Sequence, residues 1–178
     1  RFTITQETLE PRYIFQMGKY SLPIECRFEY LNGDGKRFQE VAAPYIQYNT
    51  IETDSYIFMP YSNWAGEKAQ ERQMAIYDKK AKNCFKVSTG HIKNDLTPGL
   101  PLRPITALDS HTLLYVWEAP ELLEKAEKTP SILQIEPLKG LKEDDNPVMM
   151  IVYLKIRTLH WCGVPSNLST PAPRKMPG

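Results

Sequence analysis

Residues 45–87 contain four short strand-like segments, the first with alternating apolar and polar residues, and each is separated from the next by a polar turn or loop. This alternation is typical of β-strands with one buried face, because successive side chains of a strand point to opposite faces. Short connections at Glu52–Asp54 and Asp78–Lys82 favour antiparallel neighbours. The four segments are residues 45–51, 55–59, 73–77 and 83–87. The block therefore predicts a four-stranded antiparallel sheet.

Part of the same pattern returns after a loop at residues 88–104 that is rich in Pro and Gly. Residues 105–108 and 112–117 repeat the first two strands, and residues 148–154 give a strongly apolar third strand. Between the second and the third of these strands, Pro120 suits the first turn of a helix that continues to Lys128. Successive four-stranded antiparallel sheets are the blades of a β-propeller. The predicted fold class is therefore all-β, a partial propeller with short helical insertions.

The two ends of the chain carry weaker signals. Residues 2–5 and 12–17 predict the strands of a hairpin, and residues 36–43 predict a short helix that ends before a proline. The chain begins at Arg1 inside a strand pattern, so we expect a truncated N-terminus. Residues 156–178 are rich in proline and predict a disordered tail, because proline supports neither a helix nor a sheet interior. We therefore assign residues 1–155 to the β-propeller part.

Composition narrows the classes of function. Lys and Arg total 22 against 21 Asp and Glu, a net charge of +1 that gives no electrostatic basis for binding nucleic acid. No stretch approaches the roughly 18 apolar residues that a transmembrane helix needs. The three cysteines, Cys26, Cys84 and Cys162, are far apart and predict neither a disulfide framework nor a zinc site. We expect no metal, no cofactor and no transmembrane segment.

No catalytic motif is present, so no catalytic residue is assigned. The histidines share no metalloprotease spacing, and the G-x-S-x-G element of serine hydrolases is missing. Loops at blade ends usually carry propeller function, which favours the 88–104 loop. An aromatic ring in a loop can also stack on a sugar or a peptide. The candidate ligand-binding residues are Tyr61, Trp64, His91, Asn94, Asp95 and Arg103. His91 with Asp95 could instead transfer a proton, whereas Trp117 lies in a predicted strand and is expected in the core.

Four segments of the chain resemble elements of a known family. They are Pro11–Tyr20, Glu52–Phe58 with the Tyr77–Lys80 turn that follows it, Asn94–Pro104, and Glu143–Val152. In this order they resemble the C-terminal part of uncharacterised six-bladed β-propeller proteins of Bacteroides and related bacteria. The match covers about residues 1–155. Thr97-Pro98 and Leu102-Arg103 depart from the family pattern, which has Asp-Gly and an aromatic pair there.

The resemblance implies an architecture and a location. The chain would supply about two to two and a half blades of the six, and the last blade would take its missing strand from the N-terminal end of the full protein. Family members generally carry lipoprotein-type signals, which implies a periplasmic or cell-surface protein. The function expected is a non-catalytic binding or interaction module for a glycan, peptide or protein. The alternative is a polysaccharide-acting hydrolase or lyase whose catalytic residues lie mostly outside this fragment.

Overall fold

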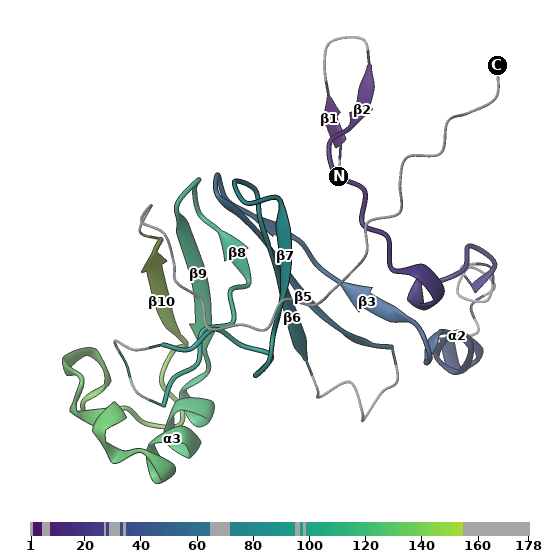
Figure 1. The fold of residues 1–178 in the computed structure, drawn as a ribbon. Helices are drawn as coiled ribbons and strands as arrows, with labels where there is room; N and C mark the ends of the chain where they lie inside the picture. Colours follow the sequence, from purple (N-terminus) through teal and green to yellow (C-terminus); the bar gives the residue numbers. More distant parts are fainter. Residues whose placement is uncertain are drawn as a thin grey trace, which may run out of the picture. The chain divides into compact units, whose positions relative to one another are not determined.

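The computed structural model describes residues 2–4, 8–26, 28, 33, 35–64, 72–94, 97 and 99–154. It consists mostly of antiparallel β-sheets with two short α-helices (Figure 1). Two compact units are present: an N-terminal unit (residues 1–48 and 61–71) and a C-terminal unit (residues 49–60 and 72–178). Strand β5, Tyr56–Asn63, runs from the C-terminal unit into the N-terminal one. The predicted tail, residues 156–178, lies outside the described residues.

The N-terminal unit begins with a hairpin of β1 (Phe2–Ile4) and β2 (Leu9–Pro11). The predicted hairpin is present, but the prediction of residues 12–17 as its second strand is wrong, because that strand is Leu9–Pro11. Pairing runs from Ile4 opposite Leu9 to Phe2 opposite Pro11, so β1 is fully paired before residue 12. Residues 12–17 have no partner strand among the described residues, and a single strand without a partner leaves its backbone groups unpaired.

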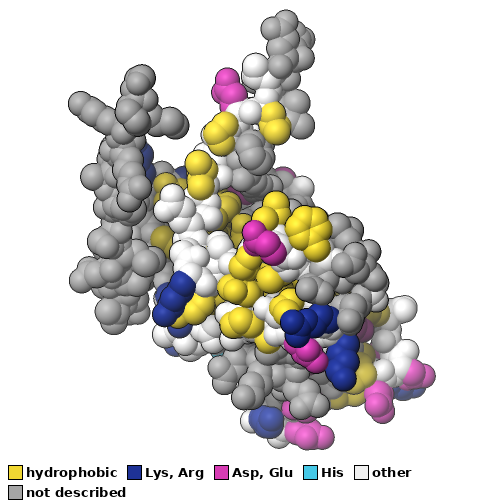
Figure 2. Space-filling model, turned by 90° about the vertical axis from the view of Figure 1, so that its right-hand side faces the viewer, with side chains coloured by type: hydrophobic (Ala, Val, Ile, Leu, Met, Phe, Trp, Pro, Cys, Tyr) yellow, Lys and Arg dark blue, Asp and Glu magenta, His cyan; other side chains and the backbone are white. Residues whose placement is uncertain are grey.

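The remaining elements of the N-terminal unit are a 3-10 turn at η1 (Gly18–Tyr20), helix α2 (Gly35–Ala42) and β3 (Ile46–Tyr48), which pairs with the end of β5. The short helix predicted at 36–43 is confirmed with a shift of one residue. It ends before Pro44 because a proline disfavours helical backbone in the residue that precedes it. Figure 2 shows hydrophobic side chains gathered on one face of the molecule. The large exposed hydrophobic residues of the N-terminal unit are Leu9, Ile14, Tyr20, Ile24, Phe28 and Tyr48.

The first sheet of the C-terminal unit contains β4 (Ile51–Glu52), β5, β6 (Gln73–Asp78) and β7 (Asn83–Val87). The predicted four-stranded antiparallel arrangement of residues 45–87 is confirmed. Its first strand is interrupted, because β3 and β4 both pair with β5 but along different stretches. At the break, the side-chain oxygen of Asn49 accepts a hydrogen bond from the Thr50 N–H at 2.7 Å.

The second sheet has the order β10-β9-β8 and is antiparallel throughout. Its strands are β8 (Thr106–Ala107), β9 (Thr112–Trp117) and β10 (Val148–Tyr153). Helix α3 (Ala119–Lys128) and two 3-10 turns, η3 (Pro130–Gln134) and η4 (Glu136–Leu138), connect β9 to β10. The three strands and the inserted helix are thus confirmed. Pro120 lies in the first turn of α3, where its missing N–H leaves no helical hydrogen bond unmade.

Two hydrophobic clusters form the core of the C-terminal unit. One lies between its two sheets and joins Ile51, Phe58, Met74 and Ile76 of the first sheet to Leu113 of the second. The other lies where α3 and the 3-10 turns cover β9, and Trp117 is 1% exposed within it, as expected from its place in a strand. Strands β9 and β10 use one face for both clusters, because side chains alternate along each strand.

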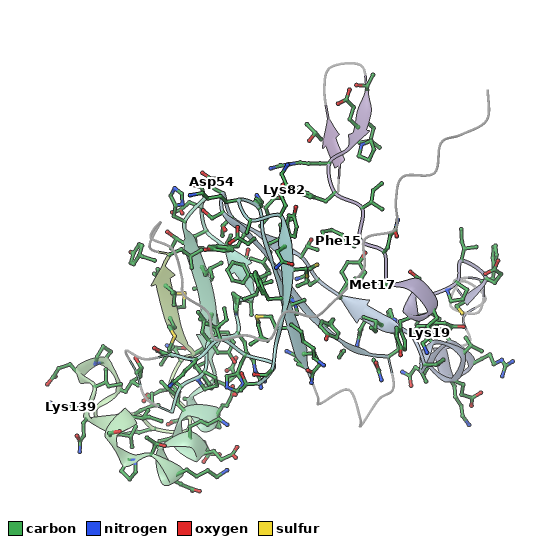
Figure 3. The ribbon with its side chains drawn as sticks, in the orientation of Figure 1. Phe15, Met17, Lys19, Asp54, Lys82 and Lys139 are labelled. Carbon is green, nitrogen blue, oxygen red and sulfur yellow. The ribbon has the colours of Figure 1, made fainter. Side chains whose placement is uncertain are left out.

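Three hairpin turns meet at one end of these two sheets. The Asp54 N–H donates to the Ser110 carbonyl at 2.9 Å, which joins the β4–β5 turn to the β8–β9 turn. The Lys79 ammonium bonds a carboxylate oxygen of Glu52 at 2.6 Å and so ties in the β6–β7 turn. Figure 3 shows Asp54 and Lys82 at this end, whereas α3 lies at the other. These contacts fix the two sheets against each other. The 88–104 loop and α3 lie at the opposite end of the sheets.

Candidate functional site

The 88–104 loop is held in place by a short antiparallel bridge across its base. Ile92 and Leu102 exchange two backbone hydrogen bonds, of 3.0 and 2.9 Å. Leu100 and Leu102 are almost fully buried and anchor the returning arm of the loop in the core. Because Ile92 and Leu102 stand opposite each other, the flanking residues His91 and Arg103 are neighbours across the same bridge.

Two glycines allow this loop to approach its neighbours closely. Gly90 has a φ of +68°, and a Cβ there would lie 2.3 Å from the Arg72 carbonyl oxygen at the start of β6. Gly99 has a φ of +87°, and a Cβ there would lie 3.0 Å from the Thr129 side chain just after α3. Both positions need a residue that adopts positive φ without a side chain. The loop is therefore docked on β6 at one side and on α3 at the other.

Burial and two cationic side chains lower the pKa of His91. Burial is the largest cause that lowers the pKa of His91, and the charge of Arg103 lowers it further. A backbone hydrogen bond involving Thr89 acts in the opposite direction, and the charge of Lys125 on α3 adds a smaller lowering effect. The imidazole is therefore held neutral near pH 7. The loop and α3 bring Arg103 and Lys125 to the same side chain, although 22 positions separate them in the sequence.

Tyr115 on β9 extends this group of side chains. Burial raises the pKa of its phenol, as does the charge of Glu121, whereas the charges of Arg103 and Arg72 lower it. Its ring meets the Trp117 ring edge to face, with 4.8 Å between the centroids. The half-buried ring of Tyr115 is thus within electrostatic range of Glu121, of Arg103 in the loop and of Arg72 just before β6. We call the group His91, Arg103, Tyr115, Lys125 and Arg72 the loop cluster.

Polar groups of the loop cluster lack partners among the described residues. The Nδ1 atom of His91 and the Nε atom of Arg103 are buried without a hydrogen bond there, as is the indole nitrogen of Trp117 behind them. Buried polar atoms in folded proteins are nearly always paired, so such atoms call for a physical explanation. The three cations of the cluster also form no ion pair with any carboxylate that the structure describes. The arrangement is suited to binding a group that supplies hydrogen-bond acceptors.

The other predicted site residues have different positions. The Asn94 side-chain oxygen accepts a hydrogen bond from the Thr97 N–H at 3.1 Å, so it shapes the loop. Asp95 lies outside the described residues, and so does any pairing of it with His91. Tyr61 and Trp64 belong to the N-terminal unit and are not part of the loop cluster. Trp64 is half-buried, and its ring contacts the Phe38 ring of α2 edge to face at 5.1 Å.

Sequence reasoning missed Tyr115, Lys125 and Arg72. Tyr115 lies in an apolar strand and Lys125 on an amphipathic helix, so each has an ordinary structural explanation in the sequence. Only the docking of the loop on α3 and β6 brings them beside His91 and Arg103. The sole available signal was the pair of glycines in the loop, because they indicate close backbone approach.

The described residues hold no group of three or more His, Cys, Asp or Glu side chains that could ligate a metal ion. Cys26 and Cys84 are free thiols, and burial raises the pKa of Cys84, which makes it less reactive near neutral pH. Among the helices that the structure describes, none has the length and apolar character needed to cross a lipid bilayer.

The stacked antiparallel sheets, with one inserted helix and a cation-lined loop, define a β-rich protein with a candidate binding site. A family model described as "Domain of unknown function (DUF4934)" matches residues 2–153, and the chain belongs to this family. A search of curated proteins gave no match.

One solved structure is similar, the crystal structure of a candidate exported protein from Bacteroides fragilis NCTC 9343. The TM-score is 0.61 at 16% sequence identity, over 86% of this chain and 44% of that protein. At this identity the likeness shows the fold alone, and the chain spans less than half of that protein's length. Together with the family match, it supports the Bacteroides-type family that the sequence motifs indicated.

Proposed function

We propose that the chain is the C-terminal part of an exported six-bladed β-propeller that binds a ligand without chemical turnover. The observation that carries the binding role is the loop cluster, where buried nitrogen atoms of His91 and Arg103 have no partner among the described residues. The cluster is built on a docked loop and a short backbone bridge, so the backbone that carries its groups is held in position before a ligand arrives. A glycan, a peptide or a protein surface could supply the acceptors.

The propeller architecture is supported by the second sheet. Strand β10 lies at the sheet edge, and Met149, Ile151 and Tyr153 on its outer face are 68%, 48% and 75% exposed. In a propeller each blade packs against a neighbour on both faces, and the last blade pairs with a strand from the other end of the chain. The remaining blades of the full-length protein would cover this face and this edge.

The proposed location follows from the neighbour in fold. The Bacteroides fragilis protein is described as a candidate exported protein. By analogy, this protein would lie in the periplasm or at the cell surface, with a lipid anchor as its means of attachment. Fractionation of the cells that express it, with detection by antibody, tests the location. Recovery of the mature protein in the cytoplasm would contradict it.

The binding role is tested on the full-length protein with an array of bacterial and host glycans and peptides. We expect retention of a ligand class by the wild-type protein and loss of that retention in the double variant His91→Ala, Arg103→Ala. The same preparations are incubated with polysaccharides, and newly formed reducing ends are measured. Time-dependent release of reducing ends by the purified protein would contradict a non-catalytic role and favour a hydrolase or lyase.

A further inference from the structure

We propose that the loop cluster binds the carboxylate group of an acidic sugar, such as the hexuronic acid unit of a glycan. This inference rests on the proposed binding function and specifies the chemistry of its ligand. It is carried by the bridge that makes His91 and Arg103 neighbours and by the unpartnered nitrogen atoms on both side chains.

The charge of the cluster favours an anion. Arg103, Lys125 and Arg72 all act on the same pair of side chains, because their charges perturb the pKa values of His91 and Tyr115. Glu121 is the carboxylate that acts on Tyr115, and no ion pair joins it to these cations in the described part of the chain. Arg103 and Lys125 are half-buried whereas Arg72 is exposed, and a cation at a half-buried site attracts an anion more strongly than a cation in bulk water does.

The hydrogen-bonding geometry favours a carboxylate in particular. Arg103 lacks an acceptor at Nε, and the Nε edge of a guanidinium presents two parallel N–H groups that match the two oxygens of a carboxylate. His91 stands across the bridge with an unpartnered Nδ1. Both side chains are half-buried, but these two nitrogen atoms are covered, so ligand binding requires the side chains to turn towards solvent.

The aromatic ring favours a sugar as the carrier of that carboxylate. Tyr115 is half-buried, packs against the core cluster that contains Trp117, and meets the Trp117 ring edge to face, so only the uncovered part of its ring can meet a ligand. A fixed aromatic ring beside a charged group offers an apolar surface to the ring carbons of a sugar while the charge is neutralised next to it. The carboxylate of a peptide terminus would also bind to the cations, but a peptide would gain less binding free energy from contact with the Tyr115 ring.

The test compares galacturonate with galactose, which differ only in the carboxylate, by calorimetry on the full-length protein at low salt. We expect the wild-type protein to bind galacturonate about tenfold or more tightly than galactose, as hydrogen bonds to a charged partner imply. Arg103→Ala should remove that difference, and Arg103→Lys should keep part of it because the charge remains. Lys80→Ala is the matched control, since this exposed lysine lies in the β6–β7 turn away from the loop, and it should bind like the wild type.

A second variant, Lys125→Gln, keeps the test informative if Arg103→Ala fails to fold, and it should weaken galacturonate binding while leaving galactose binding unchanged. If the wild-type protein binds both sugars equally and Arg103→Ala binds neither, the carboxylate proposal is overturned but the proposed binding function stands. A preference for inorganic phosphate or for an acidic peptide over galacturonate would also overturn the sugar carboxylate. Undiminished binding of every retained ligand in folded Arg103→Ala and His91→Ala would overturn both proposals.

Discussion

At the scale of single residues, Gly90 is the loop position with the least space for a side chain. Replacement by alanine puts a Cβ 2.3 Å from the Arg72 carbonyl oxygen in a backbone conformation with positive φ. We expect Gly90→Ala to lower the free energy of unfolding by about 3 kcal/mol, through backbone strain plus overpacking. Gly140→Ala is the control, because Gly140 has a similar φ of +75° with no heavy atom within 4 Å of the added Cβ.

The control should cost about 1 kcal/mol from backbone strain alone. Urea unfolding of both variants measures the difference. Equal destabilisation by the two substitutions would show that the loop does not pack on β6 as closely as the structure has it.

The ion pair of Glu52 and Lys79 makes a second residue-scale prediction. Their side chains are 11% and 15% exposed, and the Lys79 ammonium also bonds the Thr53 carbonyl at 2.5 Å. Glu52→Ala leaves a nearly buried cation without its carboxylate, so we expect a loss of about 2 kcal/mol in unfolding free energy. Asp54→Ala should change stability by less than about 0.5 kcal/mol, because the exposed Asp54 carboxylate is 3.8 Å from His111. Thermal unfolding that ranks the two variants in the reverse order would contradict this assignment.

His91 makes the third prediction, which concerns pH. Its folded-state pKa lies below the ordinary value of 6.5, so the unfolded chain binds more protons in the window just below pH 6.5. Its contribution to stability is therefore complete above pH 6.5 and is lost as the pH falls towards the folded-state pKa. His91→Gln should flatten the fall of melting temperature between pH 7 and pH 5. An unchanged slope in that variant would show that His91 is not held neutral.

The residues of the candidate site were only partly accessible from the sequence. His91, Asn94 and Arg103 were found because they lie in a loop rich in Pro and Gly between two strand patterns. Lys125 was not found, because its contact with the loop depends on how α3 docks rather than on any local pattern. Trp64 lies just after β5 as the predicted loop residue, but it is half-buried and its ring contacts the Phe38 ring of α2, which the sequence did not indicate.

At the scale of elements, helix α3 depends on the face that it turns to the core. Leu122 is fully buried in the cluster that also contains Trp117 and Ile132. We expect Leu122→Ala to lower the free energy of unfolding by about 3 kcal/mol, through lost burial and the cavity that remains. Glu124→Ala on the exposed face should cost no more than about 0.5 kcal/mol, the worth of its surface pair with Lys128.

Chemical denaturation compares these two variants. Because α3 also supports the 88–104 loop through Thr129, Leu122→Ala should make amide protons of that loop exchange faster with solvent. Unaltered exchange in the loop would separate the stability of α3 from the order of the site.

Elements with a strong local pattern were predictable, and elements that need a distant partner were not. Residues 45–87 gave correct strands because alternation and tight turns specify both the pairing and the buried face. Residues 12–17 are rich in aromatic and β-branched residues that favour strands, but pairing within the hairpin ends at Pro11 and no neighbouring strand is described. Alternation indicates that a segment can form a strand, whereas the partner decides whether it does.

At the scale of the whole molecule, the uncovered apolar face of the second sheet makes the isolated chain prone to associate with other chains. The outer face of β9 and β10 carries Leu114, Val116, Met149, Ile151 and Tyr153, all on one side because paired residues in an antiparallel sheet share a face. A contiguous apolar face next to a free strand edge promotes association with another chain. In the proposed propeller, another blade of the same protein would cover it.

The 178-residue chain in isolation should therefore self-associate or melt without a cooperative transition, as measured by light scattering and calorimetry. The double variant Met149→Thr, Ile151→Lys should reduce its self-association, because the two substitutions make the outer face of β10 polar at the sheet edge. In the full-length protein the same two changes should instead destabilise, by roughly 2–4 kcal/mol, since they would place polar groups between packed sheets. Leu108→Lys, in the β8–β9 turn, serves as the control with a small effect in both settings. A sharp, cooperatively melting monomer of the isolated chain would show that this face needs no partner, and the propeller proposal would lose its main structural support.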